Sequence, residues 1–189
     1  GQELFGVVPD LCALGKGLAN GYPLAAVVGR ADVMRVMEQI FFSITQGSEA
    51  LSLAAGLATV RKIRREPVVA TLRARGEQLT AGLADLIERH GVGEFISQSG
   101  FPVWNFINFN DLNGVAMWKI KSLWMQECHE RGVLCLGTHN LNYAHGEADI
   151  NYLLDVYDQV FPILKDAVHG GNIESHLRCD PLEPLFKVR

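Results

Sequence analysis

The sequence of 189 residues lacks any long hydrophobic run. Glycine, proline or charged residues interrupt its apolar stretches, and none reaches the roughly 18 residues that a membrane-spanning helix needs. Clusters of like charge are also scarce, because the net charge is -4 and the only dense basic stretch is residues 61–65. A solvated helix face explains that stretch better than a patch for anions or nucleic acid. We therefore expect neither a membrane nor a nucleic acid as a partner.

Cysteine is sparse and shows no recognisable pairing pattern. The four cysteines are Cys12, Cys128, Cys135 and Cys179, and none forms a CxxC pair. No secretory signal opens the chain, so free thiols in a reducing cytoplasm are the simplest interpretation. His129 follows Cys128 directly, but adjacent positions of a helix do not share a face. We expect a cytoplasmic protein without a metal site.

An initiator methionine is also missing. The chain begins GQELFG and enters an apolar stretch almost at once, without a helix start signal. This beginning is typical of the middle of a longer protein. The composition, 48% hydrophobic and 20% charged, is that of a globular chain with one or two domains.

The first third of the sequence alternates short apolar runs with a glycine-rich loop. Residues 7–14 and 24–29 predict short buried strands, and residues 15–23, with three glycines and a proline, predict the loop between them. A short helix is expected over 31–39. Ser48 is expected to cap the next helix, which is apolar almost all round and therefore buried or at a subunit interface.

The rest of the sequence predicts a long helix and then a mixed region. Pro67 ends one helix, and leucines at helical spacing predict the next over 68–90, with Gly91 as its stop. Beyond it, the expected elements are strands at 94–98, 103–109 and 133–136, and helices at 115–131 and 148–168. Pro162 should kink or shorten the last helix.

This order of elements predicts an α/β chain in three parts. Residues 1–66 are expected to end a large α/β domain, and residues 67–91 to form a connecting long helix. Residues 92–189 are expected to form a small C-terminal α+β domain.

Lys16 is the side chain with the clearest chemical potential in the first part. It follows an apolar strand and has a glycine on each side, so a bulky planar molecule has room to approach the backbone. A lysine amine becomes a nucleophile when its site lowers its pKa and an aldehyde lies within reach. Position alone, however, favours an ordinary solvent-exposed lysine in a loop.

Residues 8–29 carry a resemblance that changes this interpretation. They read VPDLCALGKGLANGYPLAAVVG, which resembles the cofactor-lysine segment of class III aminotransferases, enzymes of the fold type I superfamily that use pyridoxal 5'-phosphate. The shared pattern is Pro-Asp, a short apolar run, Gly-Lys, a glycine-rich turn, proline and a strand of small residues. The resemblance implies that Lys16 forms the Schiff base with the cofactor.

A second segment, residues 43–55, reads SITQGSEALSLAA and is similar to the threonine segment of the same family. There a threonine hydroxyl and nearby amides bind the cofactor phosphate of the partner subunit in a homodimer. The resemblance assigns this role to Thr45, with Ile44 and Gln46 beside it. A hydroxyl and free N–H groups before a helix make an anion site, although a plain helix-capping region is the alternative.

Within the class, the chain is most similar to glutamate-1-semialdehyde aminomutases and their aminotransferase relatives, and residues 137–145 resemble part of their small domain. Many aminomutases have Gly-Asn-Pro where this chain has Gly47-Ser48-Glu49, which weakens the aminomutase assignment and leaves the resemblance in fold intact. His139 and His145 could line a substrate entrance, but half-buried polar residues are the more common explanation.

The resemblance implies transfer of an amino group between an amino compound and a keto or aldehyde acceptor. It also places three parts of the site upstream of Gly1: the turn that holds the phosphate, the aromatic residue on the cofactor ring, and the aspartate that pairs with the pyridine nitrogen. Asp10 does not replace that aspartate, because it matches the Pro-Asp pair. We therefore expect a fragment that aggregates or oligomerises and is inactive alone. A 2,1-aminomutase and a non-catalytic interaction subunit remain alternatives.

Overall fold

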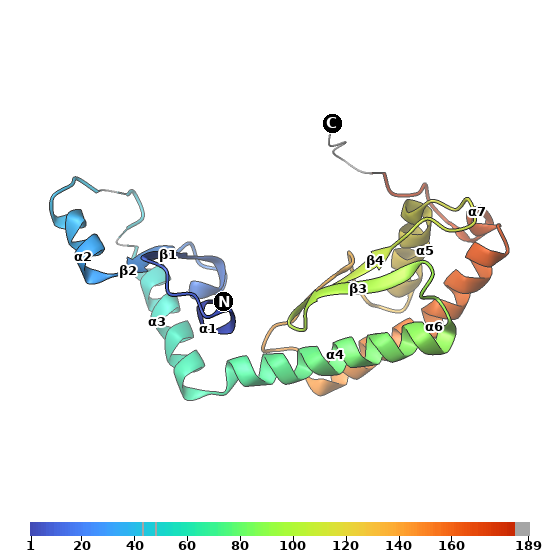
Figure 1. Cartoon of the computed structure of the whole chain (residues 1–189), viewed down its shortest axis with the longest axis horizontal. Helices are drawn as coiled ribbons and strands as arrows, with labels where there is room; N and C mark the ends of the chain where they lie inside the picture. Colours follow the sequence, from blue (N-terminus) through green and yellow to red (C-terminus); the bar gives the residue numbers. More distant parts are fainter. Residues whose placement is uncertain (43, 48, 184–189) are drawn as a thin grey trace. The chain divides into compact units, whose positions relative to one another are not determined.

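The computed structural model describes residues 1–42, 44–47 and 49–183. Ser48, which we expected to cap a helix, and the final residues 184–189 lie outside this set. Contacts group the chain into two units, Gly1–Val68 and Val69–Arg189, which are coloured from blue to cyan and from green to red in Figure 1. Whether the predicted boundaries at 66 and 91 separate the domains of a complete protein stays a prediction.

The first unit is built around a small two-stranded sheet. Its elements are α1 (Gln2–Phe5), β1 (Leu11–Leu14), η1 (Lys16–Leu18), β2 (Ala26–Gly29), α2 (Ala31–Met34), η2 (Arg35–Glu38) and α3 (Ala50–Arg65). β1 and β2 pair antiparallel, with Leu11 opposite Gly29 and Leu14 opposite Ala26. The predicted strands, loop and short helix are therefore present.

The prediction that both strands are buried is wrong. Leu11 is 47% exposed, Val27 56% and Val28 46%. Among the described residues this sheet has no third strand, and side chains on a two-stranded sheet meet water unless another layer covers them. The two strands are thus apolar in sequence, but several of their side chains are exposed to solvent in this chain.

The start of α3 also differs from the prediction. The cap is Glu49, whose carboxylate accepts hydrogen bonds from the backbone N–H groups of Leu51 (2.8 Å) and Ser52 (2.6 Å). A carboxylate can cap a helix in this way because the first N–H groups have no partner within the helix. Only Ser52 and Gly56 of α3 are buried, so the helix is not a core helix within the chain.

The second unit has a three-stranded antiparallel sheet and helices. It contains α4 (Val68–His90), β3 (Ile96–Phe101), β4 (Trp104–Phe109), α5 (Met117–Glu130), β5 (Thr138–Asn140), α6 (Glu147–His169) and α7 (Ile173–His176), and the strand order is β3-β4-β5. α4 has the predicted bounds, and Gly91 ends it with a left-handed φ of 61°.

The strand expected at 133–136 is wrong, and β5 lies further along the chain. Gly132 and Gly137 both have positive φ (75° and 95°) and bracket an irregular segment. The N–H of Val133 bonds to the carbonyl of Cys128 at the end of α5 (2.9 Å), so it is not available for a strand ladder. The chain returns to the sheet at Gly137, whose carbonyl accepts a hydrogen bond from the N–H of Ile107 (3.0 Å).

Pro162 does not shorten α6, which continues to His169. A proline inside a helix costs about 3 kcal/mol because it removes a hydrogen bond and crowds the preceding turn. Val160, Phe161 and Leu164 around it are all fully buried. Burying such side chains contributes about 1.5–3 kcal/mol each, so their packing outweighs the cost of the proline.

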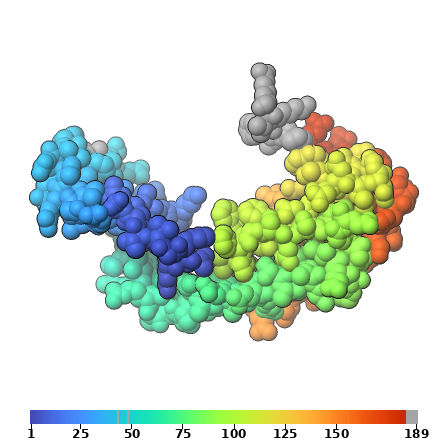
Figure 2. Space-filling model, viewed as in Figure 1, coloured from blue at the N-terminus to red at the C-terminus, as the bar shows by residue number. Residues whose placement is uncertain are grey.

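The core of the second unit is aromatic. The ring centroids of Trp124 on α5 and Tyr157 on α6 are 5.8 Å apart. Tyr157 also stacks on Phe161, with the two ring planes 8° from parallel. α4 runs along the β3–β4 hairpin (Figures 1 and 2) because Gly76 lets the hairpin backbone approach: a Cβ there would meet Pro102 at 2.5 Å. Over the described residues, no helix combines the length and hydrophobicity needed to span a bilayer.

Candidate functional site

Lys16 occupies a strained backbone position. It follows β1, opens the short helix η1, and has a φ of 51°. This left-handed conformation costs a residue other than glycine roughly 1–2 kcal/mol. Such strain persists only where the surrounding structure imposes it, and it concentrates at functional sites. The side chain is exposed.

The lysine lies at the edge of an open pocket of about 500 Å³. The pocket is lined by Lys16, Gly17, Asn20, Gly21, Tyr22, Pro23 and Leu24. Asn20 also has a left-handed φ, 47°, and Gly21 follows with 111°. A Cβ placed at Gly15, Gly17 or Gly21 would have no heavy atom within 4 Å. The glycines therefore leave open space on both sides of the lysine.

The lysine loop is held against α3. Gly56 is buried on that helix, and a Cβ there would meet the Leu24 side chain at 2.6 Å and the Leu18 carbonyl oxygen at 3.7 Å. Ala19, in the middle of the loop, is 1% exposed. The glycine on α3 thus permits the close contact that fixes the loop between the two strands.

Thr45 lies in a turn that the Gly47 N–H closes by bonding to the Ile44 carbonyl (3.2 Å). The threonine is exposed, and it does not line the lysine pocket. Ile44 instead contributes to an apolar hollow of about 630 Å³ beside β1 and β2. The Glu49 carboxylate occupies the N–H groups of Leu51 and Ser52, so these two groups are not available to an anion near Thr45.

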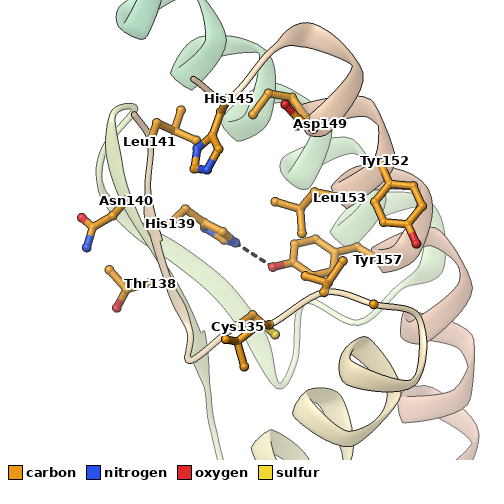
Figure 3. A pocket seen from close by; sticks show the side chains of 14 residues that line it. Cys135, Thr138, His139, Asn140, Leu141, His145, Asp149, Tyr152, Leu153 and Tyr157 are labelled. Carbon is orange, nitrogen blue, oxygen red and sulfur yellow. Dashed lines mark hydrogen bonds between the residues drawn. The ribbon is translucent and has the colours of Figure 1, made fainter. Parts of the chain in front are cut away.

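The two candidate histidines are found in the second unit, around a pocket of about 430 Å³ (Figure 3). His139 lies on β5, and His145 lies just before α6, which contributes Asp149, Tyr152 and Tyr157 to the opposite wall. His145 is half-buried, and its Nδ1 accepts from the Asn142 N–H (3.3 Å).

His139 is a buried member of a hydrogen-bond chain. Its Nδ1 lies 3.0 Å from the Asn105 Oδ1, and its Nε2 lies 2.7 Å from the Tyr157 hydroxyl (Figure 3). The Asn105 amide nitrogen donates to Gln98 and to the Ser99 carbonyl, so its Oδ1 must face the histidine as an acceptor. Nδ1 therefore carries the proton, and Tyr157 donates to Nε2.

Burial controls the protonation of this pair. It lowers the pKa of His139 to about 4, because the charged imidazolium would lose its hydration. Burial also raises the pKa of the Tyr157 hydroxyl well above its ordinary value. Both groups are neutral at pH 7, and each ring nitrogen of His139 is already hydrogen-bonded. This arrangement matches the structural alternative for His139, and nothing in it shows a substrate entrance.

Several residues of these sites were not predicted. Asn20 and Tyr22 line the lysine pocket, and the Asn20-Gly21 pair is a turn signal that would have indicated a left-handed residue. Tyr157 looked like an ordinary core position at helical spacing. Its link to His139 depends on packing between β5 and α6, for which the local sequence carries no signal.

Comparison with known proteins identifies the family. The class III aminotransferase family model matches residues 1–145. The chain is 34% identical over 164 residues to an aminopentol aminotransferase of Sphingopyxis macrogoltabida, covering 85% of this chain and 38% of that protein. It is 31% identical over 162 residues to glutamate-1-semialdehyde 2,1-aminomutase 1 of Bacillus cereus, covering 79% and 38%.

Solved structures agree with this result. The pyridoxal phosphate internal aldimine form of the FumI protein of Sphingopyxis sp. MTA144 superposes with a TM-score of 0.75 at 32% identity, over 87% of this chain and 39% of that one. An omega-transaminase from Sphaerobacter thermophilus shares the fold at 22% identity and a TM-score of 0.72. These neighbours confirm the predicted α/β fold class. The chain spans about two fifths of the length of these relatives, 38% of the aminopentol aminotransferase and 39% of the FumI protein. The chain belongs to the class III aminotransferase family.

Proposed function

We propose that this chain supplies the cofactor lysine and the phosphate-binding threonine of an enzyme that uses pyridoxal 5'-phosphate to transfer amino groups. The substrates are an amino donor and a keto or aldehyde acceptor. The observation that carries this proposal is Lys16 itself: an exposed lysine, held in a left-handed conformation between two glycines at the end of a strand. The family match over residues 1–145 supports it.

The residues present fit the cofactor chemically. The open space beside Gly15, Gly17 and Gly21 allows a planar ring to approach the Lys16 backbone. The lysine provides a primary amine for an aldehyde, and Thr45 provides a hydroxyl for a phosphate. Bound pyridoxal phosphate supplies an electron sink that stabilises negative charge at the substrate carbon.

The roles of the side chains follow from these positions. Lys16 Nζ holds the cofactor between turnovers and then acts as a base, taking the proton from the substrate Cα and returning it during transfer. The strained φ fixes where the lysine side chain leaves the backbone, which limits the positions that Nζ can reach. Thr45 orients the phosphate through its hydroxyl.

We further propose a homodimer in which Thr45 of one subunit binds the phosphate held by the other. An exposed apolar face of α3 supports this arrangement, since Leu53 is 47% exposed, Leu57 50% and Val60 41%. Large exposed apolar patches commonly mark protein interfaces.

We also propose a cytoplasmic location. The four thiols are free in the structure, which agrees with a reducing compartment.

The test compares Lys16→Ala with Lys62→Ala, a matched loss of one lysine on α3, in the protein expressed from its complete gene. Lys62 pairs with Glu66 at 2.9 Å and has no role in the proposed site. Lys16→Ala should abolish amino transfer and the absorbance band of the Schiff base between lysine and cofactor, whereas Lys62→Ala should retain both. Equal activity in the two variants would contradict the proposal. A wild-type protein without either property would favour the non-catalytic interaction subunit.

Similarity to the aminomutases, at 31% identity, supports a second candidate: migration of an amino group within one substrate. The two reactions differ in their need for a donor. An aminotransferase forms a keto product only when a separate amino donor is present, whereas an aminomutase needs no second substrate. Turnover of a single amino aldehyde without any donor would select the aminomutase.

A further inference from the structure

A glycine cap at the end of α5 reverses the chain. The N–H groups of Arg131 and Val133 both bond to the Cys128 carbonyl, at 3.1 and 2.9 Å, and the N–H of Gly132 bonds to His129 at 2.9 Å. Gly132 adopts the left-handed φ of 75° that such a reversal requires. The segment after Gly132 therefore turns back over the end of α5, toward Cys128.

This reversal brings two cysteines together. Cys128, Cys135 and Tyr157 belong to one buried cluster, and the Cys135 thiol interacts with the Cys128 thiol within it. The two cysteines differ in access. Cys128 is fully buried, whereas Cys135 is 9% exposed and lines the pocket of Figure 3. One thiol therefore faces a pocket open to solvent, and the other lies behind it.

We propose that Cys135 and Cys128 form a peroxide-sensitive dithiol, in which Cys135 reacts first and Cys128 resolves the product into a disulfide. This site is independent of Lys16 and of the proposed amino transfer. The pocket of about 430 Å³ is large enough to admit hydrogen peroxide. Contact with the Cys135 thiol and burial raise the pKa of the Cys128 thiol, so Cys128 is not the thiol that reacts first with peroxide.

The chemistry balances with peroxide as the oxidant. The Cys135 sulfur attacks one peroxide oxygen, the O–O bond breaks, and Cys135 becomes a sulfenic acid while the other oxygen leaves as water. The Cys128 sulfur then attacks the Cys135 sulfur, and the sulfenic hydroxyl leaves as a second water. The two thiols lose two protons and two electrons in total, and one peroxide becomes two waters.

The resulting disulfide would close a loop over residues 129–134, at the end of α5. Cys135, which forms part of the pocket wall, would be tied to a helix residue that does not line the pocket. Oxidation would thereby alter the wall next to Tyr157 and His139.

The test treats the full chain with hydrogen peroxide, alkylates the remaining thiols and digests without reduction. Trypsin cleaves after Lys121, Arg131 and Lys165, so Cys128 and Cys135 fall in separate peptides, 122–131 and 132–165. We expect these two peptides to become cross-linked and to separate again with dithiothreitol. Exposed Cys179 reports in the same sample whether peroxide acted.

Two variants complete the design. Cys128→Ala should leave a sulfenic acid on Cys135 that dimedone captures, and Cys128→Ser provides a second variant if the alanine variant does not fold. A background with Cys12→Ser and Cys179→Ser should still form the cross-link. The inference is overturned if Cys128 and Cys135 stay alkylatable while Cys179 oxidises. It is also overturned if Cys135 is oxidised further while Cys128 stays free.

Discussion

Acid should destabilise the second unit through one histidine. Folded His139 stays neutral until the pH reaches about 4, whereas its ordinary pKa is 6.5. The unfolded chain therefore takes up a proton near pH 6.5 that the folded chain refuses. The stability linked to this residue is intact above pH 6.5, falls as the pH decreases, and is lost by about pH 4.

The size of the effect follows from the same two values. The gap between 6.5 and about 4 corresponds to a loss of about 3 kcal/mol, which is a large part of the stability of a small domain. The burial of His139, 7% exposed, keeps solvent screening small. Protonation would also remove the acceptor at Nε2 that Tyr157 uses, because both ring nitrogens would become donors.

The assay is urea unfolding between pH 7 and pH 4, followed by tryptophan fluorescence. All three tryptophans, Trp104, Trp118 and Trp124, belong to the second unit. His139→Gln can keep one donor and one acceptor without titrating, and His129→Gln replaces an exposed histidine as the control. Titration of the carboxylates cancels between variants. We expect the wild type to lose about 3 kcal/mol more than His139→Gln, and parallel pH profiles would refute the reasoning.

Four further substitutions test one hydrogen bond, the packing of α4 and the cap of α3. Tyr157→Phe should lower the free energy of unfolding by about 1–3 kcal/mol because it leaves the buried Nε2 of His139 without a donor. Gly76→Ala should destabilise by about 1–3 kcal/mol, since its Cβ would meet hairpin backbone at 2.5 Å. Gly82→Ala should cost less, because its Cβ meets only the end of a leucine side chain. Glu49→Ala should destabilise the start of α3 by removing its cap. Urea unfolding measures all of these, and a larger loss for Gly82→Ala than for Gly76→Ala would contradict the packing.

The local sequence predicted an element correctly where its residue spacing, its start signal and its stop signal all indicated the same element. The helix Val68–His90 was predicted from leucines at helical spacing, Pro67 before it and Gly91 after it. The strand expected at 133–136 failed because the chain turns back at Gly132, where the Val133 N–H bonds to the end of α5, and Leu134 is left 87% exposed. Pro162 was misjudged for the opposite reason, since buried neighbours retain the helix around it. The first error arises from a local helix cap at Gly132 that was not recognised, and the second arises from tertiary contacts that a short window of sequence does not contain.

In the candidate site, too, the sequence identified individual residues but not the contacts between them. Lys16 was identified by resemblance, because its position alone favours a solvent-exposed lysine. Its left-handed backbone, and that of Asn20, depend on how the loop sits against Gly56 of α3. The hydrogen bonds of buried His139 reach Asn105, 34 positions before it, and Tyr157, 18 positions after it. Periodicity could place each residue on an element, but the contact itself required the fold.

The most direct test of the central claim is to locate the cofactor on the chain. The protein expressed from its complete gene is mixed with pyridoxal phosphate, reduced with borohydride and digested with trypsin. We predict a pyridoxyl group on Lys16, in a peptide that runs from residue 1 or earlier to Arg30, because trypsin does not cleave at a modified lysine. Lys16→Arg should lose the label. A stable pyridoxyl group on another lysine, or none at all, would contradict the account.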